Sequence, residues 1–162
     1  SESGTAGRRG SEAPGPRRMD EAAFRAALTD ALALPCPFGR AILRCCAACD
    51  RSSQVQIAER EAIACQNAAS HSRCKQLDAQ LRDSFTFALG KARISVPLTH
   101  AEEMRVQCGG LKGLQQVLEG RTEIENIDTL VGNALQRWGR LDGIPYSEIV
   151  HAAAAAYKGR RR

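Results

Sequence analysis

Aromatic side chains and long hydrophobic runs are both scarce in this chain. Phe, Trp and Tyr make up only 4% of the 162 residues. Leu, Ile and Ala must therefore fill most of the core, which favours helices over sheets. Arg, Glu or Gln interrupts every apolar stretch well before the roughly 18 residues that a membrane-spanning helix needs. We therefore expect no membrane span.

Motifs for catalysis and nucleotide binding are also missing. The short glycine patterns CGGLKGL at 108–114 and GRLDG at 139–143 fit neither a P-loop nor a dinucleotide-binding fingerprint. The paired acidic residues Glu59–Glu61 and Glu102–Glu103 are typical of solvated surfaces. We therefore expect a protein that is not an enzyme, and we identify no small-molecule substrate.

The net charge of +5 is concentrated at the two ends of the chain. Residues 1–18 hold four Arg and two Glu, and residues 158–162 hold one Lys and three Arg. The 139 residues between them hold 15 basic and 16 acidic side chains. A nucleic-acid-binding domain usually carries a basic face on the fold itself, so nucleic-acid binding is a distant third alternative. Basic tails more often aid solubility or bind an acidic partner weakly.

The hydrophobic pattern predicts an all-α fold, a compact bundle of five to six helices. Residues 1–18 are rich in Gly, Ser, Pro and Arg and lack an apolar signal region, which predicts a disordered arm and a cytoplasmic protein. The expected units are the arm (1–18), a cysteine-bearing helical domain (19–120), a C-terminal helical pair packed on it (121–157) and a basic tail (158–162).

Six stretches have the apolar spacing of a helix. They cover about 20–32, 37–49, 70–89, 99–119, 122–138 and 146–157. Thr99 with Glu102, and Thr122 with Glu125, are candidate capping boxes.

Ser70 is a candidate N-cap for the third helix. Gly109 and Gly110 predict a kink or restart within the fourth. The alternation in VQIAEREAIAC, residues 55–65, permits a short strand or an extended loop, and we predict irregular structure there.

Cysteine, by contrast, is abundant. Six of the seven cysteines fall within 39 residues, and CPFGRAILRC at 36–45 and CQNAASHSRC at 65–74 repeat one spacing. Nine residues of α-helix rotate by about 900°, half a turn out of alignment, so one unbroken helix cannot aim both cysteines at one site. The spacing is consistent with one shared site when the first cysteine precedes a helix and the second lies on the apolar face of that helix.

Two such units can bring four thiolates together, and the predicted site is Cys36, Cys45, Cys65 and Cys74. Nearby helix N-termini lower a thiol pKa, and backbone N–H groups can bond to ligand sulfurs. Four thiolates suit zinc or an iron–sulfur cluster. Because zinc ligands usually have two to four residues between them, the eight-residue spacing favours a [4Fe–4S] cluster over zinc.

Other interpretations of the cysteines stay open. Cys46 and Cys49 form a CxxC, for which core packing within a helix is expected, although Cys46, Cys49, Cys65 and Cys74 make an alternative ligand set. His71 is a further possible ligand. The cysteines can also fill a core without any metal. A framework of disulfides is weaker, because seven cysteines leave one unpaired.

The sequence thus predicts a small iron–sulfur or other metal-binding protein. Electron transfer, or an accessory role in a larger redox assembly, is the expected function. The alternative is a metal-free helical adaptor that binds a protein partner through its basic tails or its C-terminal lobe.

Overall fold

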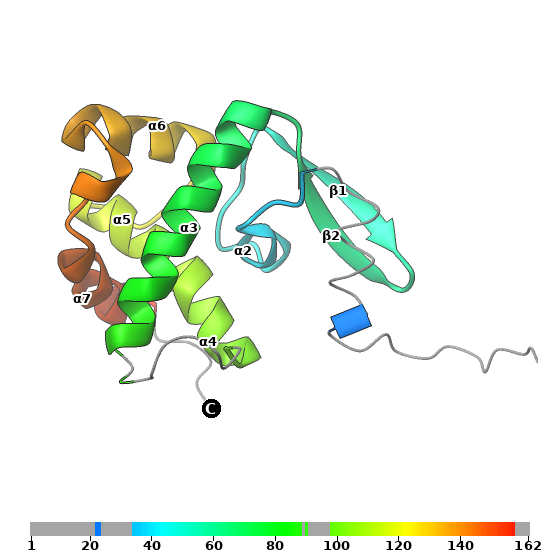
Figure 1. The fold of residues 1–162 in the computed structure, drawn as a ribbon, viewed down its shortest axis with the longest axis horizontal. Coiled ribbons are helices and arrows are strands. Elements are labelled where there is room, and N and C mark those ends of the chain that lie inside the picture. The colour runs from blue at the N-terminus through cyan, green and yellow to red at the C-terminus, as the bar shows by residue number, and fades with distance from the viewer. Residues whose placement is uncertain (1–21, 24–33, 89, 91–97, 158–162) are drawn as a thin grey trace, which may run out of the picture.

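Helices dominate the structure, a computed structural model that describes residues 22–23, 34–88, 90 and 98–157. The helices gather around one core, and a two-stranded antiparallel sheet extends to one side (Figure 1). The predicted N-terminal arm, most of the helix expected over 20–32 and the basic tail lie outside the described residues. Within those residues, no helix has the length and apolar character to cross a membrane.

One short helix precedes the hairpin, and helices of different lengths follow it. In chain order they are α2 Gly39–Leu43, β1 Ser52–Ile57, β2 Arg60–Cys65, α3 Ala68–Ala88, α4 His100–Met104, the π-helical turn η1 Arg105–Gly109, α5 Gly110–Glu119, α6 Ile127–Trp138, the 3₁₀ turn η2 Leu141–Gly143 and α7 Tyr146–Ala156. The fold is therefore mostly helical but not purely so, which corrects the all-α prediction.

The hairpin is the element that the sequence analysis missed. β1 and β2 pair antiparallel from Ser52↔Cys65 to Ile57↔Arg60, which leaves a two-residue turn. In the sequence, such turns are usually marked by Asn or Gly at a position of positive φ. Here Ala58 takes that position with a φ of 57°, so the usual turn signal is absent.

The helix predicted over 37–49 is wrong in extent. α2 spans only Gly39–Leu43, and Cys45 then adopts the left-handed conformation with a φ of 62°. A non-glycine residue rarely takes that conformation, and nothing in the sequence marks Cys45 for it. Cys46 and Cys49 consequently lie on irregular chain after the helix and not on a helical face.

The long helix α3 confirms its predicted apolar stripe. Cys74, Leu77, Leu81 and Phe85 are all buried. Its cap differs from the prediction: the side chain of Asn67 accepts a hydrogen bond from the backbone N–H of Ser70 at 2.8 Å, as an N-cap does. Ser70 itself lies inside the helix and is buried, and its hydroxyl donates to a side chain described below.

The segment from α4 to α5 runs as one continuous helix. Thr99 and Glu102 form the predicted capping box, which is confirmed. Where the paired glycines predicted a kink or restart, the chain instead widens into the π-helical turn η1. Gly120, with a φ of 75°, ends α5 as a left-handed C-cap.

The two C-terminal helices complete the core. α6 begins at Ile127, capped by Asn126, so the predicted capping box at Thr122 is wrong and the helix starts later than its apolar pattern suggested. α7 packs along α5, where a Cβ added to Gly113 would lie 2.5 Å from the backbone oxygen of Ile149. Glycine thus permits the close approach of these helices.

Candidate metal centre

Four free cysteines line one pocket at the junction of the hairpin and the helices. They are Cys36, Cys49, Cys65 and Cys74. Each comes from a different segment: the loop before α2, the irregular chain after α2, the end of β2, and the apolar stripe of α3. The rest of the lining comprises Pro37, Arg51, Ser52, Ser70, Ile127 and Asp128.

Backbone hydrogen bonds hold the Cys36 segment beside the hairpin. The N–H of Cys36 donates to the carbonyl of Ile63 at 2.9 Å, and the N–H of Cys65 donates to the carbonyl of Leu34 at 2.7 Å. Pro35 forms a β-bridge with Ala64 between these two bonds. The chain before α2 therefore acts as a short third strand, which brings the first cysteine of each repeated motif to the same edge.

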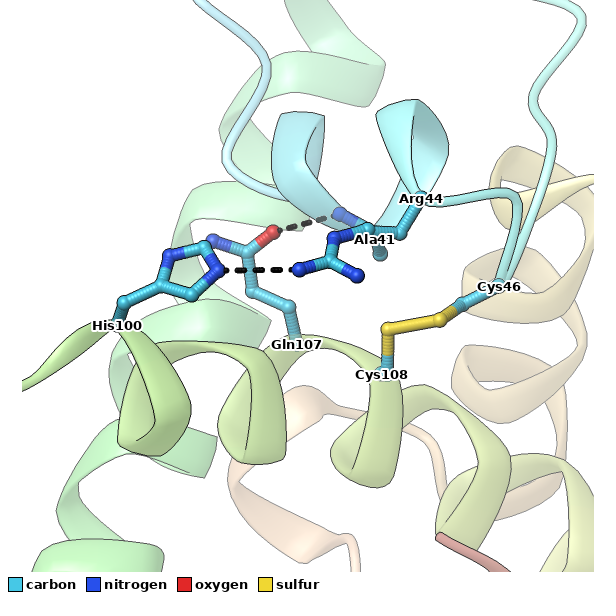
Figure 2. Close-up of a disulfide and its surroundings, with 6 residues drawn as sticks. All are labelled: Ala41, Arg44, Cys46, His100, Gln107 and Cys108. Atoms are coloured by element: carbon cyan, nitrogen blue, oxygen red, sulfur yellow. Dashed lines mark hydrogen bonds between the residues drawn. A yellow bond between two sulfur atoms is a disulfide. The ribbon is translucent and has the colours of Figure 1, made fainter. Parts of the chain in front are cut away.

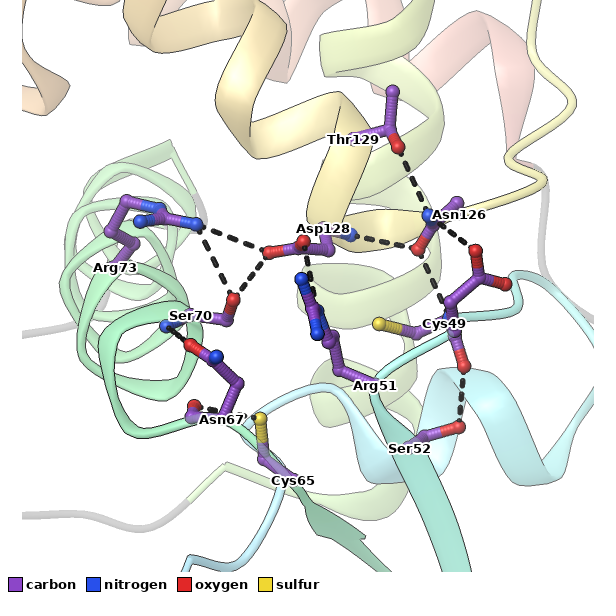
Figure 3. A network of polar contacts seen from close by, with 11 residues as sticks. Cys49, Arg51, Ser52, Cys65, Asn67, Ser70, Arg73, Asn126, Asp128 and Thr129 are labelled. Carbon is purple, nitrogen blue, oxygen red and sulfur yellow. Dashed lines mark hydrogen bonds and ion pairs between the residues drawn. The ribbon is translucent and has the colours of Figure 1, made fainter.

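Cys49 reaches the pocket from the irregular chain that leads into β1. Its carbonyl accepts hydrogen bonds from the backbone N–H of Ser52 at 3.2 Å and from the Ser52 hydroxyl at 2.7 Å (Figure 3). Because Ser52 pairs with Cys65 across the hairpin, this turn brings Cys49 toward Cys65. The thiol of Cys65 donates to the carbonyl of Asn67 at 3.3 Å.

Two thiols of the pocket, those of Cys36 and Cys74, are poor acids as they stand. Burial raises the pKa of the Cys36 thiol to about 12, a backbone hydrogen bond from Phe38 lowers it, and the nearby Cys49 and Cys65 raise it further. Burial also raises the pKa of Cys74, and Cys36 is the next largest cause. Both thiols are therefore protonated at neutral pH, and a bound cation would have to displace their protons.

The thiols do not already form the ligand set of a single ion. Four sulfurs bound to one zinc ion lie about 3.8 Å from one another. In the described part of the chain, no group of three or more His, Cys, Asp or Glu side chains could hold a metal ion as it stands. The open space at the pocket is about 10 Å³, room for one water-sized sphere. This space is too small for a cluster of several iron and sulfide atoms, so the surrounding segments would have to move apart to admit one.

Cys45, which the spacing placed in the predicted set, does not line this pocket. It is exposed, and its left-handed backbone directs the chain away from the helix. Cys49 occupies the fourth position instead. The roles of Cys36, Cys65 and Cys74 as ligands stay predictions. His71 is not among the lining residues, and its Nε2 lies 2.9 Å from the carbonyl oxygen of Pro35, to which it donates.

Sequence analysis also missed a disulfide between Cys46 and Cys108 (Figure 2). It joins the chain after α2 to the π-helical turn η1, across 62 residues. Beside it, the buried side chain of Gln107 accepts a hydrogen bond from the backbone N–H of Ala41 at 3.1 Å. No local pattern signals so distant a pair. A cytoplasmic location stays a prediction, and disulfides are rare in reducing cytoplasm.

A polar network borders the thiols at the N-terminus of α6 (Figure 3). The carboxylate of Asp128 accepts a hydrogen bond from the Ser70 hydroxyl at 2.6 Å. It also accepts from Arg73 at 3.2 Å and from Arg51 at 3.4 Å. Hydrogen bonding from Ser70 is the main reason that the pKa of Asp128 is lowered. The pocket therefore carries fixed charges next to its sulfur atoms.

Known proteins offer no match to this chain. Neither a family model, nor a curated protein, nor a solved structure matches it. The function must accordingly be inferred from the chemistry of the pocket.

Proposed function

We propose that this protein binds an iron–sulfur cluster through Cys36, Cys49, Cys65 and Cys74 and acts in electron transfer. The observation that carries the proposal is the convergence of four free cysteines from four separate segments on one pocket. Cys74 belongs to the hydrophobic core, and Cys36 and Cys49 pack against it, so core packing without a metal is the competing interpretation. Such a cluster supplies one-electron redox chemistry when bound.

The four side chains are of the type that the group requires. Thiolate sulfur is the ligand that both iron–sulfur clusters and structural zinc prefer. A cluster with several iron atoms takes ligands from wider separations than one zinc ion does. Among the described residues, no group of three or more His, Cys, Asp or Glu side chains is placed to hold a metal ion, so either group would require the thiols to move. Zinc is the alternative group for the same four residues.

The position of the pocket suits a carrier of electrons. Cys36, Cys49 and Cys65 are only partly buried, so the site lies close to the protein surface. An electron carrier needs no general acid, base or nucleophile of its own. We therefore infer a small accessory or electron-transfer component of a larger redox assembly, and a protein partner docks near the pocket in this proposal.

The test is to express and purify the protein without oxygen and to measure absorbance, iron, zinc and sulfide. We expect a broad band near roughly 400 nm and about four irons per chain. Bound zinc without sulfide would make the site structural. A colourless, metal-free and folded protein would overturn the proposal in favour of a helical adaptor.

A matched pair of variants assigns the fourth ligand. We expect Cys49→Ser to lose most of the bound iron, because it removes a thiol from the pocket. Cys45→Ser should keep the iron content of the unmodified protein, because Cys45 is exposed and outside the pocket. The reverse result would restore the ligand set that the sequence spacing predicts and would refute the set proposed from the pocket.

A further inference from the structure

Strand β1 has a partner on one side only. Its neighbour β2 pairs with β1 along one edge and with the chain at Pro35 along the other. In the described part of the chain, no strand pairs with the outer edge of β1. The hairpin also projects away from the helices, so this edge lies at the periphery of the fold (Figure 1). An unpaired edge presents backbone N–H and C=O groups to which another strand can bind.

The register of the hairpin fixes which backbone groups point outward. In an antiparallel pair, residues that hydrogen-bond to each other alternate with residues that turn their N–H and C=O groups away. The N–H of Gln66 donates to the carbonyl of Arg51 at 2.8 Å, so these two residues hydrogen-bond across the hairpin. Counted from Arg51, the odd-numbered residues of β1 bond to β2. The backbone groups of Gln54 and Gln56 therefore point outward.

Two observations support this assignment. Ile63 pairs with Gln54, and its carbonyl accepts a hydrogen bond from Cys36 at 2.9 Å on the far side of β2, as an outward-turned residue does. The backbone groups of Gln54 and Gln56 have no partner among the described residues, whereas the N–H of Ser52 donates within the turn that precedes β1. The open edge thus consists of Gln54 and Gln56.

This edge lacks the features that usually block pairing with another strand. Natural edge strands are protected by charged side chains, by proline or by a bulge. The strand Ser52–Ile57 contains no charged residue, no proline and no glycine, and it pairs with β2 without a bulge. Gln54 and Gln56 are exposed, and Val55 between them is half-buried. A second strand can therefore approach along β1.

We propose that two copies of this chain pair antiparallel through β1, about a two-fold axis at Val55. This inference does not rest on the proposed function. In this register Gln54 of one copy lies opposite Gln56 of the other, so every open residue meets an open residue and exchanges both backbone hydrogen bonds with it. A two-fold register shifted in either direction would place an open residue opposite Ser52 or opposite the turn residue Ala58.

Charge complementarity supports a second copy as the partner. In the same register, Arg51 just before β1 is aligned with Glu59 in the turn of the other copy, and Asp50 is aligned with Arg60. Opposite charges across a pair of strands are stabilising, whereas like charges are destabilising. Between these charged ends only uncharged side chains meet, with the two copies of Val55 at the axis.

The experiment is sedimentation velocity of the full chain from micromolar to submillimolar concentration. Every protein carries Cys45→Ser, which removes an exposed thiol as a source of covalent dimers. The mass should rise with concentration from that of one chain, 17.5 kDa, toward that of two. Gln54→Pro should stay monomeric, because proline lacks the outward N–H and leaves the bonds to β2 in place. The matched control Gln54→Ala keeps this N–H and should dimerise like its parent.

A cross-link tests the register even if Gln54→Pro fails to fold. Val55→Cys places two thiols at the axis, where Cα atoms about 4.5 Å apart can form a disulfide. Ser53→Cys is the control on the same face of β1, since each copy of Ser53 lies opposite Ile57 of the other. After mild oxidation, peptide mass spectrometry should find the cross-link between the two copies only for Val55→Cys. Circular dichroism of each variant checks that the fold is kept.

Three results would overturn the inference. The parent protein could stay monomeric at every concentration, whether its β1 edge is free or is covered by another segment of the chain. Folded Gln54→Pro could dimerise as strongly as Gln54→Ala. The cross-link could form at Ser53→Cys and not at Val55→Cys. None of these results bears on the metal content of the pocket, so the proposed function stands or falls separately.

Discussion

Gly113 offers the sharpest test of how the helices pack. A Cβ at this position would lie 2.5 Å from the backbone oxygen of Ile149 and 3.1 Å from the backbone nitrogen of Ala153. Ordinary van der Waals contact begins at 3.4 Å, so α7 would have to withdraw by close to 1 Å from α5. Neither atom belongs to a side chain that can rotate away. Overpacking of this kind costs about 1–3 kcal/mol.

The control is the same substitution at Gly132 on α6, where nothing lies within 4 Å of the added Cβ. Gly→Ala within a helix stabilises by about 0.5–1 kcal/mol through helix propensity, and both variants share this gain. The difference in unfolding free energy between them therefore isolates the contact with α7. Urea unfolding followed by far-ultraviolet circular dichroism should show Gly113→Ala less stable than Gly132→Ala by about 1–3 kcal/mol. Equal midpoints would refute the close packing of α5 and α7.

Three further predictions concern sulfur and buried charge. Reducing the Cys46–Cys108 disulfide should lower the unfolding free energy by about 4 kcal/mol, because the disulfide closes a loop of 62 residues. Urea titrations with and without a dithiol reductant measure this difference, and equal unfolding free energies would contradict the prediction. In metal-free protein at neutral pH, iodoacetamide should modify exposed Cys45 first and buried Cys74 among the last, as peptide mass spectrometry can follow; equal rates would contradict the burial of Cys74. Burial raises the pKa of Asp78 to about 6 from an ordinary value of 3.8, so its contribution to stability is present below pH 4 and is lost as the pH rises through 6. In Asp78→Asn this loss should be absent. The unfolding free energy of the variant minus that of the unmodified chain should therefore rise by up to about 3 kcal/mol between pH 4 and pH 7. A difference that does not change with pH would contradict the prediction.

The helices were predictable where the local signals were strong. The stripe of α3 follows 3.6-residue spacing, and its members are buried because one face of the helix meets the core. The capping box at Thr99 is equally local, since both of its hydrogen bonds connect residues three apart. Patterns of this kind need no knowledge of the rest of the molecule.

The features that sequence analysis missed depend on unmarked backbone conformations or on distant contacts. The hairpin turns at Ala58, and α2 ends before Cys45, although neither residue favours positive φ. The second of these deviations decides which cysteine reaches the pocket. If α2 had continued to Cys49, we would expect Cys45 to be the fourth cysteine of the pocket. Because the helix ends early, Cys49 lines the pocket instead.

The π-helical turn η1 lets one helix meet two differently placed neighbours. Residues 106–111 are buried without a break, which a regular surface helix cannot achieve because its faces alternate between core and solvent. Deleting one residue here would restore an ordinary α-helix and rotate α4 by about 100° relative to α5. Gln107 and Cys108 would then no longer both face the α2 segment while Gly109 and Gly113 face α7. The inserted residue thus acts as a phase shift, and the length of this helix is as constrained as its composition.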